Sequence, residues 1–440
     1  MIAMHRMRLR GNFTAILVSL LLAVFGAACQ SPDSRPASPP ASPVGSGSFA
    51  TGHYRNLFAE AGHPPDEIKA RLLAAHRQLF HGDPRTEAVY FPTGANSNGP
   101  LAYIHDLANG DVRSEGMSYG MMIAVQLDRK AEFDALWNWT KTFMGHASPS
   151  HPASGYFSWS MKTNGVANDE MPAPDGEEYF ATALLFASGR WGNGPGIYDY
   201  RREANRILTD LRHRPSITGV TVKGRQTAVA IFHPTEKMVR FTPDVDNSEH
   251  TDPSYHLPAF YELWARIGPV ADRGFWAEVA ATSRDFLNRA AHPVTGLTPD
   301  YANFDGSPWG SPWNPRSADF QVDAWRTVMN WSVDWAWWSK DARQPRLSDR
   351  VLAFFAAQGI ARYGNHFTLD GRRTGDSHSA GLVAMNATAS LAATDPRARD
   401  FVEALWNTPV PTGPYRYYDG MLYLLGLLHC SGEFRVWQPQ

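Results

Sequence analysis

The chain has 440 residues, of which 43% are hydrophobic and 19% charged, so it can bury a large core and is long for one domain but short for three. Its formal net charge of -2 gives no cationic footprint for nucleic acid or anionic lipid, and we expect no nucleic-acid partner. The 15 Trp, 16 Tyr and 23 Phe suit either a tryptophan-rich core or a surface that holds the flat faces of sugar rings.

The first 28 residues resemble a targeting segment. Three arginines, Arg6, Arg8 and Arg10, precede an apolar run over residues 15–25, which is shorter than a membrane span. We therefore expect a signal peptide over 1–28 and an exported protein, in the periplasm or anchored at the bacterial cell envelope. Cys29 could carry a lipid, although Gly26 stands where such a signal usually has Leu, and a flexible Ser/Pro/Ala-rich tether is expected over 29–51.

Helical periodicity dominates the rest of the chain. A first helix is predicted over 66–80, and with it the helical patterns that continue up to residue 430 number about a dozen. The Gly-, Pro- and Asn-rich stretch 81–111 is predicted to be a long surface loop, and β-branched alternation predicts a small β-excursion around 216–241. The expected fold class is all-α, with one domain over 52–440.

One carboxylate opens the most hydrophobic of these helical segments. Met117, Met121 and Val125 recur at helical spacing after Glu115, which predicts a buried helix with Glu115 in its first turn. Burial raises the pKa of a carboxyl and the positive end of a helix lowers it, so this glutamate could be tuned for catalysis. It could equally satisfy backbone donors, as acidic residues do at many helix starts.

The segment that follows Glu115 also contains a G-x-S-x-G pattern around Ser118. In serine hydrolases this pattern needs a buried strand directly before the nucleophile, whereas the preceding letters here, GDVRS, are typical of a loop. A serine esterase using Ser118 therefore remains only an alternative from another class.

Two further acidic positions precede helical runs. Asp175 lies just before a helix expected from about residue 177, where it could be an N-cap. Asp323 and Arg326 are three residues apart within a helix expected over 318–340, which suggests an ion pair that keeps Asp323 ionised. With Trp325 beside it, Asp323 could also be a general base on a sugar-binding face, in an environment opposite to that of Glu115.

Cysteine and histidine usage predicts neither metal nor cofactor. Cys29 and Cys430 are the only cysteines, a disulfide between them is not expected, and Cys430 lies in an apolar helical pattern as a small buried side chain. No H-E-x-x-H or C-x-x-C spacing occurs among the scattered histidines, so no metal site is indicated.

In the segments around the acidic residues Glu115, Asp175 and Asp323, the sequence resembles glycoside hydrolase family 8, and within it the reducing-end xylose-releasing exo-oligoxylanases. The resemblance covers about residues 52–437 and rests on ordered motifs: RSEGMSYGMM, GYFSWSM, APDGEEYFATALLFA, TDPSYHLPAFYELWA, DAWRTVMNWSVD, SHSAGLVAMNA and YYDGMLYLLGLLHCSGEFRVW. It implies an (α/α)6 barrel of six inner and six outer helices and hydrolysis with inversion at the anomeric carbon.

The resemblance also implies roles for four catalytic residues. Glu115 is implied as the general acid and Asp323 as the general base that activates water, with a carboxyl separation of roughly 6.5 to 9.5 Å. Asp175 matches a third acidic position that assists sugar distortion, and Tyr255 matches a tyrosine beside the base. The residues implied to bind substrate are Trp159 and Trp325 by stacking, His378 and Tyr418 on the leaving-group side, and Arg326.

The expected substrate is therefore a β-1,4-xylo-oligosaccharide, cut by a monomeric enzyme that releases xylose from the reducing end. Alternatives are an endo-acting xylanase, glucanase or chitosanase on the same barrel, and a non-catalytic sugar-binding lipoprotein. Xylose lacks the C6 hydroxymethyl group, so a steric block in the site would separate the first alternative from the other two enzymes.

Overall fold

The computed structural model describes residues 45–439, all within one compact unit. The predicted signal peptide, Cys29 and most of the predicted tether lie outside these residues. The last part of the tether does not: residues 48–51 form the short helix α1 (Ser48–Thr51), and the Phe49 ring packs on Trp338 with centroids 4.3 Å apart. The folded unit therefore begins before residue 52, the predicted boundary.

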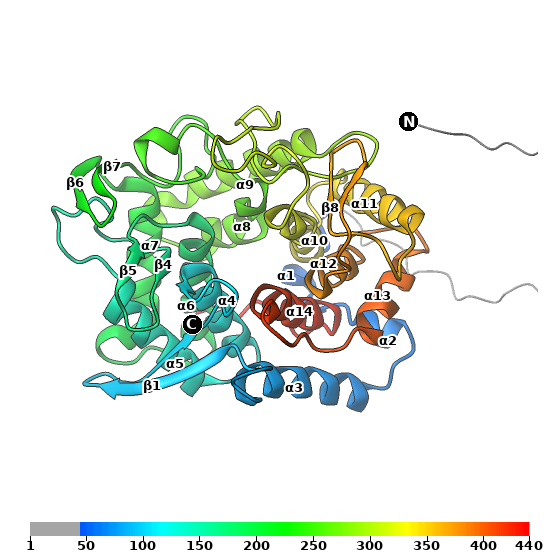
Figure 1. Ribbon diagram of the computed structural model, residues 1–440, viewed down its shortest axis with the longest axis horizontal. Helices are drawn as coiled ribbons and strands as arrows, with labels where there is room; N and C mark the ends of the chain where they lie inside the picture. The colour runs from blue at the N-terminus through cyan, green and yellow to red at the C-terminus, as the bar shows by residue number, and fades with distance from the viewer. Residues whose placement is uncertain (1–44, 440) are drawn as a thin grey trace, which may run out of the picture. The chain divides into compact units, whose positions relative to one another are not determined.

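The described residues are mostly helical, as the periodicity predicts (Figure 1). Besides α1 and α2 (Leu57–Glu60), twelve longer α-helices are present: α3 (Pro65–His81), α4 (Ser114–Gln126), α5 (Lys130–Trp139), α6 (Pro174–Trp191), α7 (Tyr200–His213), α8 (Pro258–Ile267), α9 (Arg273–Ala290), α10 (Thr327–Trp338), α11 (Gln344–Gln358), α12 (Ala380–Ala389), α13 (Ala398–Asn407) and α14 (Arg416–Cys430). None of the helices within 45–439 is long and apolar enough to span a membrane.

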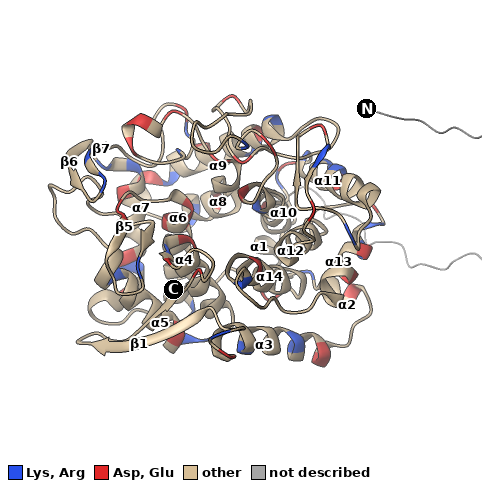
Figure 2. Cartoon of the chain, viewed as in Figure 1, with Lys and Arg blue, Asp and Glu red and all other residues tan. Residues whose placement is uncertain are grey.

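These helices fall into two sets by burial. Nearly every residue of α4, α6, α10, α12 and α14 is buried, and α8 is buried over most of its length. Each of them packs against an amphipathic neighbour: α5 on α4, α7 on α6, α9 on α8, α11 on α10, α13 on α12 and α3 on α14. Charged residues follow this division, since α3 carries both signs whereas α12 carries none (Figure 2).

The buried helices also contact one another in chain order. Packing joins α4 to α6, α8 to α10, α10 to α12, α12 to α14, and α14 back to α4. Two buried hydrogen bonds link α6 to α8: Tyr261 Oη donates to Glu178 Oε1 at 3.0 Å, and Trp264 Nε1 donates to Thr182 Oγ1 at 3.1 Å. The core of residues 45–439 is thus built from these six mostly buried helices.

Four small antiparallel sheets lie in the connections. They comprise β1 (Tyr90–Asn96) with β2 (Gly99–Ile104), β3 (Val112–Arg113) with β4 (Ser160–Met161) and β5 (Ala167–Asp169), β6 (Ile217–Thr221) with β7 (Gly224–Ala228), and β8 (His366–Phe367) with β9 (Arg373–Gly375). The β6–β7 hairpin confirms the predicted β-excursion. The prediction of a long loop over 81–111 is wrong. The Gly and Asn residues of this stretch lie in the turn and at the register shift of the β1–β2 hairpin.

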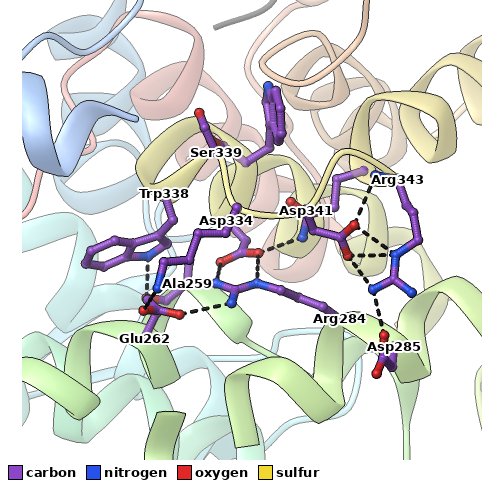
Figure 3. A network of polar contacts seen from close by, with 12 residues as sticks. Ala259, Glu262, Arg284, Asp285, Asp334, Trp338, Ser339, Asp341 and Arg343 are labelled. Atoms are coloured by element: carbon purple, nitrogen blue, oxygen red, sulfur yellow. Dashed lines mark hydrogen bonds and ion pairs between the residues drawn. The ribbon is translucent and has the colours of Figure 1, made fainter. Parts of the chain in front are cut away.

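A buried ion network ties the buried helices together away from their first turns (Figure 3). Arg284 of α9 donates to both oxygens of Asp334 on α10 at 2.7 Å, and to Glu262 of α8 at 2.9 Å. Gln344 Nε2 at the start of α11 also donates to Asp334, at 2.6 Å. Because these groups lie under packed helices, their pairing fixes the relative position of α8, α9 and α10.

The helix predicted over 318–340 begins later than expected. Residues 323–326 form a 3₁₀ turn, η6 (Asp323–Arg326), and α10 starts only at Thr327. Another 3₁₀ turn, η4 (Pro253–Tyr255), precedes α8. Both turns directly precede buried helices. Backbone N–H groups at such a position have no partner within the helix and can form hydrogen bonds with side chains instead.

Candidate active site

The three carboxylates singled out by the sequence meet at one guanidinium. Arg326 Nη1 donates to Glu115 Oε2 at 2.9 Å and to Asp175 Oδ2 at 2.7 Å, while Nη2 donates to Asp323 Oδ1 at 3.2 Å. Nη2 also donates to Ser254 Oγ at 2.8 Å. With only 2% of Arg326 exposed, this is a buried cation shared by three acids from α4, α6 and η6.

These residues come together because each lies at the start of a buried helix. Glu115 is in the first turn of α4 and Asp175 in the first turn of α6, where Oδ1 of Asp175 accepts from the Gly176 amide at 2.8 Å. Asp175 is therefore inside the helix, and Ala173 is its N-cap. Tyr417, at the start of α14, adds a donor to the same cluster.

Glu115 has the environment of a proton donor. Its side chain is 14% exposed, and burial raises its pKa from 4.5 to about 7 against the opposing charge of Arg326. The nearby charges of Asp175 and Asp323 raise the pKa further. Its Oε1 accepts a hydrogen bond from Tyr417 Oη at 2.8 Å. Glu115 therefore exchanges its proton near neutral pH.

Asp323 is the most accessible of the three acids, with 31% of its side chain exposed. Burial of the site also raises its pKa, Arg326 lowers it, and Asp175 raises it. The prediction that Arg326 sets Asp323 apart from Glu115 is therefore wrong. A guanidinium carries five N–H donors, and here its two terminal nitrogens serve Glu115 and Asp323 at once.

A cavity of about 710 Å³ opens onto this cluster. Glu115, Asp175, Asp323 and Arg326 form part of its wall, and the cavity extends toward the β6–β7 hairpin at Lys223. Its aromatic lining residues are Trp159, Phe241, Tyr255, Tyr301 and Trp313. Buried carboxylates beside flat aromatic faces match what binding and cleaving a neutral sugar chain requires.

Two predicted residues line this cavity beside the acids. Trp159 precedes β4, where its carbonyl accepts from the Ser114 amide at 2.9 Å, and the Arg113 guanidinium lies 5.6 Å from its ring centroid. Tyr255 ends η4 and is 8% exposed, with the Arg326 guanidinium 5.8 Å from its ring centroid. Each of these rings therefore lies near a guanidinium that lines the cavity, Arg113 for Trp159 and Arg326 for Tyr255.

Three other predicted residues lie apart from the cavity lining. Trp325 is 4% exposed and donates from Nε1 to the Asn365 carbonyl at 2.9 Å. Its ring centroid is 5.7 Å from that of Tyr418, whose hydroxyl donates to the Val322 carbonyl at 2.9 Å. The exposed His378 is bonded through Nδ1 to the Tyr363 carbonyl at 3.0 Å. None of these three side chains forms a hydrogen bond with the three acids within the described residues, although the Arg326 guanidinium lies 6.0 Å from the Tyr418 ring centroid.

Ser118 cannot be the nucleophile of an esterase. It lies inside α4 with no exposed surface, and its hydroxyl donates to the Glu115 carbonyl at 2.9 Å. The serine elbow needs an exposed hydroxyl on a tight turn between a core strand and a helix, which this position does not provide. The close presence of Glu115 and Asp323 likewise disfavours a silent sugar-binding protein.

Sequence reasoning missed several residues of the site. Tyr417 was passed over for its neighbour Tyr418, although only Tyr417 bonds Glu115. Asp252 and Asp300 are also buried near Asp323, and burial followed by the charge of Asp323 raises both pKa values well above the usual range. Asp300 Oδ1 accepts from the Ala324 amide at 3.0 Å. Both aspartates stand in polar segments next to a proline, TDPSY and TPDYA, which no local pattern distinguishes from ordinary loops.

Comparison with known proteins agrees with this site. The family model of glycosyl hydrolases family 8 matches residues 97–432. The reducing-end xylose-releasing exo-oligoxylanase Rex8A of Paenibacillus barcinonensis is 44% identical over 396 residues, which are 90% of this chain and 99% of that protein.

Solved structures give the same result. A GH8 xylobiose complex from Teredinibacter turnerae is 59% identical, with a TM-score of 0.88 over 89% of this chain and 100% of that chain. A xylohexaose complex of a catalytic mutant xylanase from that organism matches equally well. Because the family model spans most of the sequence and these relatives align over their full length, the chain belongs to glycosyl hydrolases family 8.

Proposed function

We propose that this protein is an inverting hydrolase that releases xylose from the reducing end of β-1,4-xylo-oligosaccharides. The observation that carries the proposal is the convergence of Glu115, Asp175 and Asp323 on Arg326 at the wall of an aromatic-lined cavity. The exo-oligoxylanase relative, aligned over 99% of its length, supports the substrate and the mode of release. The paired helix contacts support an (α/α)6 barrel as the fold.

Glu115 is the general acid of this proposal. A pKa of about 7 leaves much of it protonated at neutral pH, so its hydroxyl can donate to the glycosidic oxygen as the leaving xylose departs. Tyr417 and Arg326 then stabilise the carboxylate that remains, because both can donate to it. Burial favours the protonated form of Glu115 before the bond is cut, and the two hydrogen-bond donors favour its carboxylate form afterwards.

Asp323 is the general base. It is more exposed than the other two acids, so a water molecule can reach it from the cavity; burial raises its pKa, and the charge of Arg326 opposes that rise. An inverting mechanism places this water between the base and the anomeric carbon, with the carboxyls roughly 6.5 to 9.5 Å apart. Asp175 assists distortion of the sugar, and Tyr255 lies beside the base and its water.

The remaining predicted residues are assigned to substrate binding. Trp159, which lines the cavity, and Trp325 are assigned to stacking on sugar rings, and Tyr418 and His378 to the leaving-group side. Hydrogen bonds of the Trp325 indole and the Tyr418 hydroxyl to backbone carbonyls hold these two rings in place.

An endo-acting xylanase is the second candidate. The specific observation in its favour is the xylohexaose complex of the 59% identical structure, which is described as a xylanase. The two modes differ in which bond of a long substrate is cut first.

Product analysis distinguishes them. Residues 45–440 are incubated with xylotriose and xylohexaose labelled at the reducing end, and products are followed by NMR. Reducing-end release with inversion predicts labelled α-xylose as the first product from both substrates. Labelled xylobiose or xylotriose from xylohexaose at the earliest times would instead establish endo-action, and untouched substrates would refute both.

We also propose that the protein is exported and held at the cell envelope through Cys29. The support is the N-terminal pattern of three arginines, an apolar run and a small-residue site before this cysteine. Expression of the full chain in a Gram-negative host should give a lipidated species in the membrane fraction. Cys29→Ser should move it to the soluble periplasmic fraction; an unprocessed N-terminus in mass spectrometry would contradict the proposal.

A further inference from the structure

Two groups of two histidines and a glutamate come together in the described part of the chain, and neither includes one of the three acids of the site. One comprises His76 and His81 of α3 with Glu132 of α5. The other comprises His146, His151 and Glu170, in the loops around β4 and β5. In each group, one ligand atom per residue lies within 4.8 Å of the others.

We propose that the first group, His76, His81 and Glu132, binds a divalent transition-metal ion of the zinc type. His76 Nε2 lies 2.9 Å from Glu132 Oε2, and His81 Nε2 lies 2.8 Å from Glu132 Oε1. Two imidazole nitrogens and a carboxylate are a donor set that zinc takes, with water in the fourth position.

The hydrogen bonding of the rings permits this binding. Within residues 45–439, neither His76 nor His81 forms another hydrogen bond, so each ring can carry its proton on Nδ1 and turn the Nε2 lone pair toward an ion. His151 of the second group differs. Its Nδ1 accepts from the Ala153 amide at 3.1 Å, which keeps the proton on Nε2, the atom that faces Glu170. That ring cannot offer Nε2 to a metal without losing a backbone hydrogen bond.

The two nitrogen–oxygen distances need only a small adjustment, and the ligand atoms all lie within 4.8 Å of one another. Ligand atoms about 2.0 to 2.1 Å from a tetrahedral zinc ion are about 3.3 Å apart, slightly more than the observed nitrogen–oxygen distances. The His81 side chain is 50% exposed at the last residue of α3, so it can move outward. His76 is 3% exposed and stacks on Phe80 at 4.5 Å, which keeps it in position.

Charge favours the same conclusion. The Glu132 side chain is 13% exposed, and the two histidines are its only ion-pair partners within the described residues. A divalent cation between these side chains would neutralise the carboxylate of Glu132. The ion would join α3 to α5, two helices on the outer side of the fold (Figure 1), and it would be structural because the three catalytic acids do not belong to this group.

Metal binding to chelator-treated protein tests the proposal. Zn²⁺ is titrated by calorimetry, and Co²⁺ is followed through the visible absorption of a tetrahedral site, in wild type and in His81→Ala, Glu132→Gln and His151→Ala. We expect one equivalent with micromolar or tighter affinity in wild type and His151→Ala, and loss of that equivalent in the other two. Zinc a hundredfold above Kd should raise the melting temperature by about 2 to 5 °C only where this equivalent binds.

Three other results would overturn the proposal of a zinc site. These are no zinc bound by wild type, an equivalent that survives His81→Ala, or one that disappears in His151→Ala. Because His81 is half exposed, His81→Ala should melt like wild type without metal, which separates lost binding from lost folding. Hydrolysis of xylotriose should proceed equally with and without zinc, so failure of this proposal leaves the proposed activity untouched.

Discussion

Tyr417 donates a hydrogen bond of 2.8 Å to Glu115, and its ring also lies directly against the backbone of Gly116. A Cβ atom at Gly116 would come within 2.5 Å of the Tyr417 ring. The glycine therefore allows α14 to approach α4 closely enough for its tyrosine to reach the catalytic acid. This one contact therefore links the glycine at position 116, the packing of α14 on α4 and the protonation of Glu115.

Removal of this hydrogen bond should change the pH dependence of hydrolysis. Tyr417→Phe deletes a donor that favours the ionised form of Glu115, so the pKa of Glu115 should rise and the alkaline limb of kcat/KM should move up by about one pH unit. Initial rates on xylotriose between pH 5 and 9 measure the shift, with Tyr418→Phe as the matched control. An unchanged alkaline limb would show that Tyr417 does not act on Glu115.

Glu115→Gln should abolish activity but increase stability at alkaline pH. Loss of the general acid should lower kcat by about 10²- to 10⁴-fold. The pKa of Glu115 is raised from 4.5 to about 7 by folding, so below pH 4.5 the residue is neutral in both states and has no effect. Between pH 4.5 and about pH 7, Glu115 ionises in the unfolded chain but not in the folded protein, so the free energy of unfolding falls as pH rises. Above pH 7 the full destabilisation, about 3 kcal/mol, remains.

The glutamine variant lacks this ionisation. Its stability relative to wild type should therefore increase between pH 4.5 and pH 8, as measured by urea unfolding at the two values. An equal difference at both pH values would mean that burial does not hold Glu115 protonated.

Asp300 should act as a neutral acceptor that positions the general base. Its Oδ1 accepts from the Ala324 amide, next to Asp323, and burial holds its pKa well above the usual range. Asp300→Asn keeps the acceptor and the neutral charge, so kcat should stay within about threefold of wild type, whereas Asp300→Ala leaves a buried amide unpaired, at about 1 to 3 kcal/mol of stability. The alanine variant should lose kcat more than KM. Equal inactivity of both variants would require an ionised Asp300.

The network of Figure 3 should contribute to stability and not to catalysis. Arg284→Met leaves Asp334 and Glu262 without this buried partner and should destabilise the fold by about 3 to 5 kcal/mol in chemical denaturation. Arg343→Ala is the matched control, since Arg343 is 36% exposed and its pairs should contribute under about 1 kcal/mol. At temperatures where both variants are folded, kcat on xylotriose should match wild type. Similar losses of stability in the two variants would contradict the role of burial.

Local pattern was sufficient to predict the helices and the acids at their starts. Glu115 and Asp175 precede apolar runs, and the structure places both in first turns of buried helices. Cys430 is buried and free, as its apolar context predicts. These features depend on neighbours within one or two turns, which a sequence displays directly.

Features that depend on distant contacts were missed or misread. Arg326 is three residues from Asp323, so sequence pairs it with Asp323 alone, but folding brings Glu115 and Asp175 to the same guanidinium. The choice between Tyr417 and Tyr418 depends on which face of α14 meets α4. The group of His76, His81 and Glu132 has no recognisable spacing, because it forms between two helices.

The sharing of Arg326 among three acids has a consequence for inhibition. Three acids share Arg326, and Arg113 is a second guanidinium at the cavity wall, so acidic groups outnumber these two cations and favour the positive charge that develops on the sugar ring during glycoside cleavage, leaving a negative potential there. A neutral xylose gains little from that potential. A xylose-sized ring with a protonated nitrogen would gain much more, and we expect such a cation to bind more tightly than the product, with an affinity that weakens as the acids take up protons.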